Sequence, residues 1–398
     1  MLSNEKILNY YLPDDRIARF PTSKRDNSKL LIYKNNCIEE SVFSFISNFI
    51  PENTLLIFND TQVIQARFLF KKHNTIIEIF CIEPIFPSDY TLSFNQRISC
   101  IWLCLIRNAK RWKNNCMLSC NLNANTSLTV QKLKQTHDGY LVKFTWNDSN
   151  LTFANILEQC GYLPLPPYLK RKFEEHDKEN YQTIYANTKG SVAAPTAGLH
   201  FTNDVFYSLE KKHILIDYLT LHIGAGTFRP IKSKIISDHK MHAEHFFIKK
   251  KTIEFLIKYK QVFAVGTTSV RVIESLYYIG LILGRENNVL VSDINIPQWM
   301  PCFIDEAYIS PQKALENIID YMNIKKINVL SGTTKMLIMS GYKFKIVKGI
   351  ITNFHQPRST LLLLISAFIG EEWQKIYDYA LQNGFRFLSY GDSSLLIP

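Results

Sequence analysis

Two short stretches rich in small residues carry histidines, and together they predict a pocket for a small molecule. The first covers residues 190–202 and contains His200; the second covers residues 219–229 and contains His222. Glycine lets the backbone approach a ligand closely, and a few polar side chains beside such backbone are typical of small-molecule sites. The same composition also fits tight turns that serve only the fold, so both interpretations stay open.

Proton transfer is the chemistry that these histidines suit best, because the pKa of an imidazole lies near neutrality. We expect His200 or His222 to act as a general base; the alternative is that both only hold the glycine turns by hydrogen bonds. Glu244 and Asp392 are the next candidates for acid–base chemistry. The residues expected to bind substrate lie beside the histidines or open a later helix: Pro195, Thr196, Gly198, Gly224, Gly226, Thr227, Arg229, Gly266, Thr267, Thr268 and Arg271.

A metal site is a second interpretation of His239, His242 and Glu244. At helical spacing the two histidines share one face, but Glu244 points away from it. The pairs Cys100/Cys104 and Cys116/Cys120 lie in strand-like segments without the chelating turn of a zinc site. We therefore expect no bound metal and no disulfide framework, and a metal-dependent hydrolase using the first three residues remains an alternative function.

Composition describes an ordinary globular protein with a basic surface. The chain has 398 residues, 46% of them hydrophobic and 20% charged, and a formal net charge of +11. Such a charge favours a polyanionic partner, although biased codon usage also enriches lysine. The longest apolar run, residues 361–369, is far shorter than the roughly 20 residues of a membrane span. No secretory signal begins the sequence, so we expect a cytoplasmic protein without membrane contact.

Strands and helices alternate on both sides of a region with a different pattern. Residues 261–265 predict a buried strand that leads through a glycine turn into a helix, which is a doubly-wound unit. Between about residues 68 and 146, short strand patterns follow one another without a helical pattern, which favours a small barrel. We predict an α/β main domain from residues 1–67 and 150–398 with an inserted all-β barrel domain at 68–149. A helix is also expected over residues 39–49.

Long motifs occur in the same order as in one known family, across nearly the whole chain. They include Ala-Ala-Pro-Thr-Ala-Gly-Leu-His-Phe at 193–201, Leu-His-Ile-Gly-Ala-Gly-Thr-Phe-Arg-Pro at 221–230 and Gly-Thr-Thr-Ser-Val-Arg at 266–271. Further matches lie at residues 12–26, 59–67, 163–168, 181–183, 239–244, 341–344, 352–360 and 389–392. With these motifs the chain resembles the S-adenosylmethionine:tRNA ribosyltransferase-isomerases of queuosine biosynthesis. The departures from the family pattern, at Gln62, Gln65, Ser340, Gln356 and in the length of 280–330, leave these motifs intact.

The resemblance implies transfer and isomerisation of the ribosyl part of S-adenosylmethionine onto 7-aminomethyl-7-deazaguanine at the tRNA wobble position. Epoxyqueuosine forms, and adenine and methionine leave. The resemblance implies no cofactor and no metal, an α/β domain interrupted by a β-barrel, and tRNA as partner; we expect a monomer. Arg229 or Arg271 is expected to pair with the methionine carboxylate. Expected RNA contacts are His355, Arg358, Lys170 and Arg171. A non-catalytic RNA-binding protein and a methyltransferase remain alternative classes.

Overall fold

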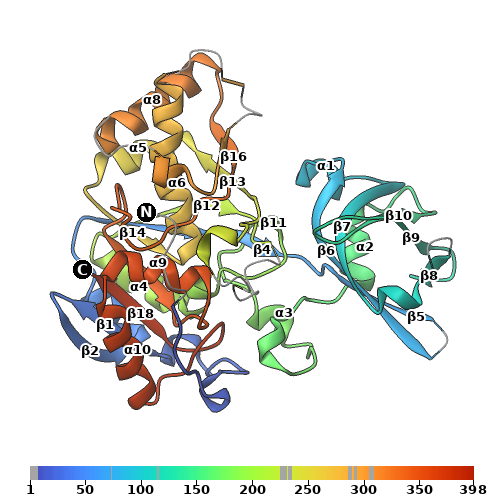
Figure 1. Ribbon diagram of the computed structural model, residues 1–398, viewed down its shortest axis with the longest axis horizontal. Helices are drawn as coiled ribbons and strands as arrows, with labels where there is room; N and C mark the ends of the chain where they lie inside the picture. The colour runs from blue at the N-terminus through green and yellow to red at the C-terminus, as the bar shows by residue number, and fades with distance from the viewer. Residues whose placement is uncertain are drawn as a thin grey trace.

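Two β-sheets of different size and pattern dominate the structure. The computed structural model describes residues 8–72, 74–113, 116–224, 231, 235–285, 289–290, 294–303 and 309–398. In this part of the chain the larger sheet has ten strands and the smaller one six. Figure 1 shows the six-stranded sheet on one side of the molecule, with the short pair β4 (Thr61–Val63) and β11 (Thr188–Ser191) between the two sheets.

The ten-stranded sheet has a parallel centre formed by the order β12-β3-β14-β17. Its outer strands include antiparallel pairs, β12 with β13 on one side and β17 with β18 on the other. Along the whole sheet the order is β15 (Asn295–Ile296), β16 (Val329–Thr334), β13 (Glu244–Lys249), β12 (Leu215–Leu221), β3 (Thr54–Asn59), β14 (Gln261–Val265), β17 (Gly349–Asn353), β18 (Ser393–Ile397), β1 (Lys29–Lys34) and β2 (Cys37–Val42).

Helices cover both faces of this sheet, so its central strands are buried on both sides. In β3 the side chains of Leu55 and Ile57 join the hydrophobic core under one layer of helices, and those of Leu56 and Phe58 join the core under the other. This alternation follows from the two-residue period of a strand. The first layer contains α5 (Lys250–Lys258), α6 (Thr267–Leu283), α8 (Pro311–Ile324), α9 (Thr360–Ile369) and α10 (Glu372–Gln382); the second contains α4 (Asn203–Lys211).

The six-stranded sheet is antiparallel throughout and nearly closes on itself, because its edge strands β5 and β8 contact each other. Its strands are, in sheet order, β5 (Arg67–Lys72), β6 (Thr75–Phe86), β7 (Ser99–Arg107), β10 (Tyr140–Trp146), β9 (Ser127–Gln135) and β8 (Met117–Asn121). It has its own hydrophobic core, to which α2 (Phe153–Cys160) contributes Phe153 and Ile156. The predicted mixed α/β class with a barrel-like β region is therefore confirmed.

The helix predicted over residues 39–49 is wrong. Strand β2 and the 3-10 helix η3 (Phe43–Asn48) occupy this range, and β2 pairs with β1 in a hairpin. Asn35 and Asn36 form its turn with φ angles of 50° and 61°. Two consecutive left-handed residues are the requirement of a tight hairpin turn, and asparagine adopts that conformation readily. Within the described residues, no helix has the length and apolarity needed to cross a membrane.

Candidate active site

A pocket lies where the parallel strands β14 and β17 end, at the carboxyl edge of the large sheet. Its walls come from the first turn of α6, from residues 352–356 at the end of β17 and just beyond it, and from the small-residue stretch 193–197. The hollow takes in about 690 Å³ of space, which includes open solvent. Of the predicted site residues, six line it: Pro195, Thr196, Gly266, Thr267, Thr268 and His355.

The first turn of α6 forms one wall because β14 passes directly into this helix through Gly266. Gly266 has φ +86°, a left-handed value that favours glycine. The first intrahelical bond runs from Val270 N to Gly266 O, so the amides of Thr267, Thr268 and Ser269 precede it. Amides at this position have no acceptor within the helix and carry the positive end of its dipole.

Arg271, one turn further along α6, faces a carboxylate of the protein itself. Its guanidinium forms a buried ion pair with Glu244 of β13, and both side chains are less than a tenth exposed. An internal pair of this kind leaves little net charge for a ligand. The same pair engages Glu244, which the alternative metal interpretation grouped with His239 and His242. Throughout the residues that the structure describes, no cluster of three potential metal ligands occurs.

His355 is the predicted site histidine that reaches the pocket. Its Nε2 lies 3.0 Å from Thr352 Oγ1, and its backbone N–H donates to Tyr377 Oη at 3.1 Å. Tyr10 Oη donates to its carbonyl oxygen at 2.5 Å. Burial lowers the pKa of His355 to about 3, so the imidazole is neutral at physiological pH. The ring is thus held in place as a neutral group at the pocket wall.

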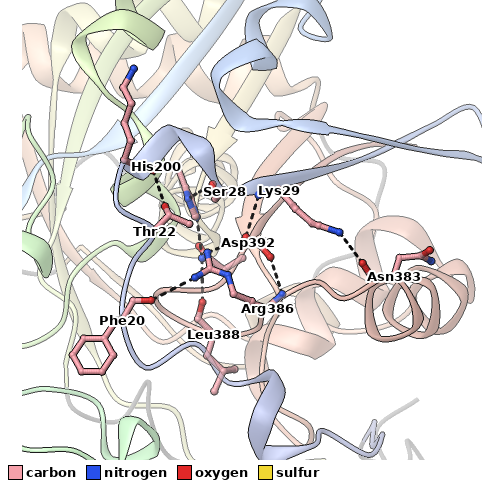
Figure 2. A network of polar contacts seen from close by, with 11 residues as sticks. Phe20, Thr22, Ser28, Lys29, His200, Asn383, Arg386, Leu388 and Asp392 are labelled. Carbon is pink, nitrogen blue, oxygen red and sulfur yellow. Dashed lines mark hydrogen bonds and ion pairs between the residues drawn. The ribbon is translucent and has the colours of Figure 1, made fainter.

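His200 lies beyond the pocket, at the end of the 3-10 helix η6 (Thr196–His200). Ser28 Oγ is 2.8 Å from its Nδ1, and Asn353 Nδ2 is 3.1 Å from its Nε2. Both ring nitrogens are therefore engaged with protein groups. Burial also lowers the pKa of His200 to about 4. Figure 2 shows His200 beside Ser28 in a network that continues to Asp392 and Arg386.

His222 follows strand β12 and is packed among protein groups. Its Nδ1 lies 3.0 Å from Thr61 Oγ1, and its ring centre is 4.7 Å from that of Tyr90. A Cβ on Gly190 would come within 2.4–2.6 Å of the imidazole ring, so glycine is required there for space. Burial, and then the nearby His245, lower the pKa of His222 to about 4. The next residue, Ile223, lines the pocket instead.

Asp392, predicted as a possible acid or base, is buried and bound by backbone and side-chain donors (Figure 2). Lys29 N donates to its Oδ1 at 3.1 Å and Arg386 N to its Oδ2 at 2.7 Å. Arg386 Nη2 also lies 3.1 Å from Oδ1. These bonds tie the loop before β18 to the start of β1, which indicates a positioning role.

The other predicted contacts occupy different environments. Arg171 forms a two-pronged ion pair with Asp177, at 2.7 and 2.6 Å, and its side chain is only 10% exposed. Lys170 and Arg358 are exposed, and Lys170 Nζ lies 2.5 Å from Asp14 Oδ1.

The predicted glycines differ in the space around them. A Cβ on Gly198 would lie 1.8 Å from Tyr185 Oη, whereas one on Gly224 would meet nothing within 4 Å. Gly226, Thr227 and Arg229 lie outside the described residues.

Sequence reasoning missed several polar residues of the pocket. Tyr168 Oη and Ser389 Oγ are 2.5 Å apart and both residues line it, as do Thr352 and Asn353. All four belong to motifs that carry the family resemblance, at 163–168, 352–360 and 389–392. Membership of those motifs was the available indication, because nothing in their spacing predicts that they meet.

Comparisons with known proteins agree along the whole chain. The family model described as queuosine biosynthesis protein matches residues 6–396. Proteins named S-adenosylmethionine:tRNA ribosyltransferase-isomerase from Sulfurihydrogenibium sp. and Halothermothrix orenii are 34% and 35% identical, each with 98% of both chains covered. A solved structure of an S-adenosylmethionine tRNA ribosyltransferase from Thermotoga maritima is 25% identical, covers 98% of this chain and 99% of its own, and has a TM-score of 0.47. The chain belongs to the queuosine biosynthesis protein family.

Proposed function

We propose that this chain is an S-adenosylmethionine:tRNA ribosyltransferase-isomerase. It transfers the ribosyl part of S-adenosylmethionine to 7-aminomethyl-7-deazaguanine at the wobble position of tRNA and isomerises it, so that epoxyqueuosine forms and adenine and methionine leave. One observation carries the proposal: motifs shared with the family, far apart in sequence, line the same pocket. The lining residues from these motifs are 193–197, 266–268, 352–356 and 389, and relatives that bear this enzyme name cover nearly the whole chain.

The reaction needs a proton acceptor near the 5′ carbon, whose hydrogens are acidified by the adjacent sulfonium. The C5′–H bond breaks, the acceptor takes the proton, and the electron pair stays on the carbon beside sulfur. His200 and His222 are the candidates expected from the sequence, but both rings are packed among protein groups. We add His355, because it lines the pocket with a neutral ring that Thr352 orients. We assign hydrogen-bonding of the departing adenine to the adjacent hydroxyls of Tyr168 and Ser389, because both residues line the pocket.

Transfer RNA is the proposed macromolecular substrate, and its phosphates match the net charge of +11. Lys170 and Arg358 are the predicted contacts with exposed side chains, so we retain them as phosphate contacts. Arg171 is bound to Asp177 and His355 lies at the pocket, which argues against a phosphate contact for either.

We also propose the division predicted from the sequence, a barrel domain at 68–149 inserted into a domain made of residues 1–67 and 150–398. The separate hydrophobic core of the six-stranded sheet supports it, although α2, after the second boundary, shares that core. We further propose that catalysis needs no cofactor or metal and that the enzyme acts as a cytoplasmic monomer.

The decisive experiment incubates the protein with S-adenosylmethionine and tRNA that carries the precursor base, and follows free adenine. We expect adenine release that depends on both substrates and persists with a chelator. Formation of S-adenosylhomocysteine would instead indicate a methyltransferase. Binding of tRNA without any adenine would indicate a non-catalytic RNA-binding protein, and loss of activity with the chelator a metal-dependent enzyme.

A further inference from the structure

The first turn of α6 presents hydrogen-bond donors to the pocket that the protein itself leaves unused. Thr267 and Thr268 line the pocket and are 5% and 6% exposed. Side chains on a helix lean toward its N-terminus, so these hydroxyls are directed at the pocket. In the described part of the chain, neither hydroxyl has a hydrogen-bond partner. Both hydroxyl oxygens keep some accessible surface, so a ligand in the pocket can accept a hydrogen bond from each.

Other hydroxyls of the same helix behave differently. Ser269 Oγ donates to Val265 O at 2.8 Å, and Ser275 Oγ donates to Arg271 O at 2.7 Å. The hydroxyl of each serine thus donates to the backbone carbonyl four residues earlier, as is common in helices. Thr267 and Thr268 are the first two residues of the helix, so the residues four positions earlier belong to β14 and offer no helical carbonyl. Their hydroxyls therefore make no such bond in the turn that lines the pocket.

Of the two arginines that the sequence predicted for this role, Arg271 is paired with Glu244, and Arg229 lies outside the described residues. The described donors at this wall are the amides of Thr267, Thr268 and Ser269, which precede the first intrahelical bond at the positive end of the α6 dipole. Amides and hydroxyls converging at a helix N-terminus form a site for an anionic oxygen group.

We infer that residues 266–269 bind the carboxylate of the amino-acid part of S-adenosylmethionine; this inference rests on the proposed function. The two threonine hydroxyls and the free amides donate to the carboxylate oxygens. A phosphate of the tRNA has the same acceptor chemistry, but small and apolar residues such as Ala193, Ala194 and Ile223 line the same pocket. Such walls suit the compact end of a small molecule better than a charged chain of phosphates.

The test measures binding of two ligands to the full-length protein by calorimetry: S-adenosylmethionine and its decarboxylated analogue. For T267V and T268V we expect affinity for S-adenosylmethionine to fall about 10- to 100-fold, the usual effect of losing a hydrogen bond to a charged group. Affinity for the analogue should stay unchanged, because it lacks the acceptor. Thr268→Ser keeps the hydroxyl and should restore binding. Thr252→Val is the matched control, since Thr252 is a fully buried helical threonine outside the pocket.

Three outcomes would overturn the inference. The variants could bind both ligands as the unmodified protein does, or lose affinity for both equally. They could also bind S-adenosylmethionine normally but bind tRNA more weakly with a reduced salt dependence, which would assign the turn to a phosphate. Each leaves adenine release by the unmodified protein, and hence the proposed function, in place. If the unmodified protein neither binds S-adenosylmethionine nor releases adenine, the proposed function fails and this inference fails with it.

Discussion

His355 and His222 both follow parallel strands at the carboxyl edge of the large sheet, yet their surroundings differ. His222 comes directly after β12 and His355 two residues after β17, and both strands belong to the parallel centre of the sheet. Both rings are buried, and burial lowers the pKa of both. The ring of His222 fills a space bounded by Gly190, Thr61 and Tyr90, whereas His355 borders the open pocket.

The difference shows that a histidine in a glycine-rich block need not face the ligand. In residues 221–224 the pocket is lined by Ile223, while His222 points to the other side and packs on Gly190. Small residues serve two purposes here. Ala193 and Ala194 leave room for a ligand, and Gly190 leaves room for an imidazole of the protein.

The largest expected effect separates the two histidines by activity. We predict that H355Q lowers the rate of adenine release about 10²- to 10⁴-fold, as loss of a general base does, with little change in melting temperature. H222Q should retain most of its turnover while melting at a lower temperature, because its ring fills packed space. Single-turnover adenine release and thermal denaturation measure the two effects.

The exposed His137 supplies the control, because H137Q changes the same residue type far from the pocket. Normal turnover of H355Q together with a large loss in H222Q would reverse the assignment. The reacting carbon would then lie near Thr61 and Gly190.

Much of this arrangement was accessible from the sequence. The alternation of strands and helices predicted the mixed α/β fold, and the glycine after residues 261–265 predicted a helix N-terminus at the carboxyl edge, where Gly266 and Thr267 line the pocket. Closely spaced strand patterns predicted the barrel-like sheet. These features depend on local periodicity and turn residues, which a sequence displays directly.

Side-chain direction was not accessible in the same way. Whether His222 or Ile223 faces the pocket depends on the register of β12 and on Gly190, which are distant in the chain. The pairing of Arg271 with Glu244 likewise depends on how α6 lies against β13. The missed hairpin at Asn35–Asn36 is a different failure, because consecutive asparagines can adopt left-handed φ and their turn was recognisable.

A smaller effect tests the packing of His222 from the other side of its contact. We predict that G190A destabilises the protein by about 1–3 kcal/mol, the usual cost of overpacking, because the new methyl would overlap the imidazole. G224A should be close to neutral in stability, since a Cβ there meets nothing within 4 Å. Urea denaturation of both variants makes the comparison. Equal stability of the two would show that the His222 ring has room to move.

The last effect, small near neutral pH, is a pH dependence of stability carried by the packed histidine. The folded pKa of His222 is about 4, below its ordinary value of 6.5, so between these values the unfolded chain binds the proton and the folded chain does not. Stability is therefore fully present above about pH 6.5 and falls as pH drops toward 4, by about 1.4 kcal/mol per pH unit for each such histidine. The pKa of His200 is lowered to the same value, so His200 adds an equal share to the pH dependence.

Urea denaturation at pH 7, 6 and 5 measures this effect. The free energy of unfolding should fall less steeply with pH for H222Q than for the unmodified protein, while H137Q serves as the exposed control. Parallel slopes for H222Q and the unmodified protein would mean that water or a rearranged carboxylate reaches the imidazole. His222 would then not be closed off from solvent, and its contrast with His355 would be lost.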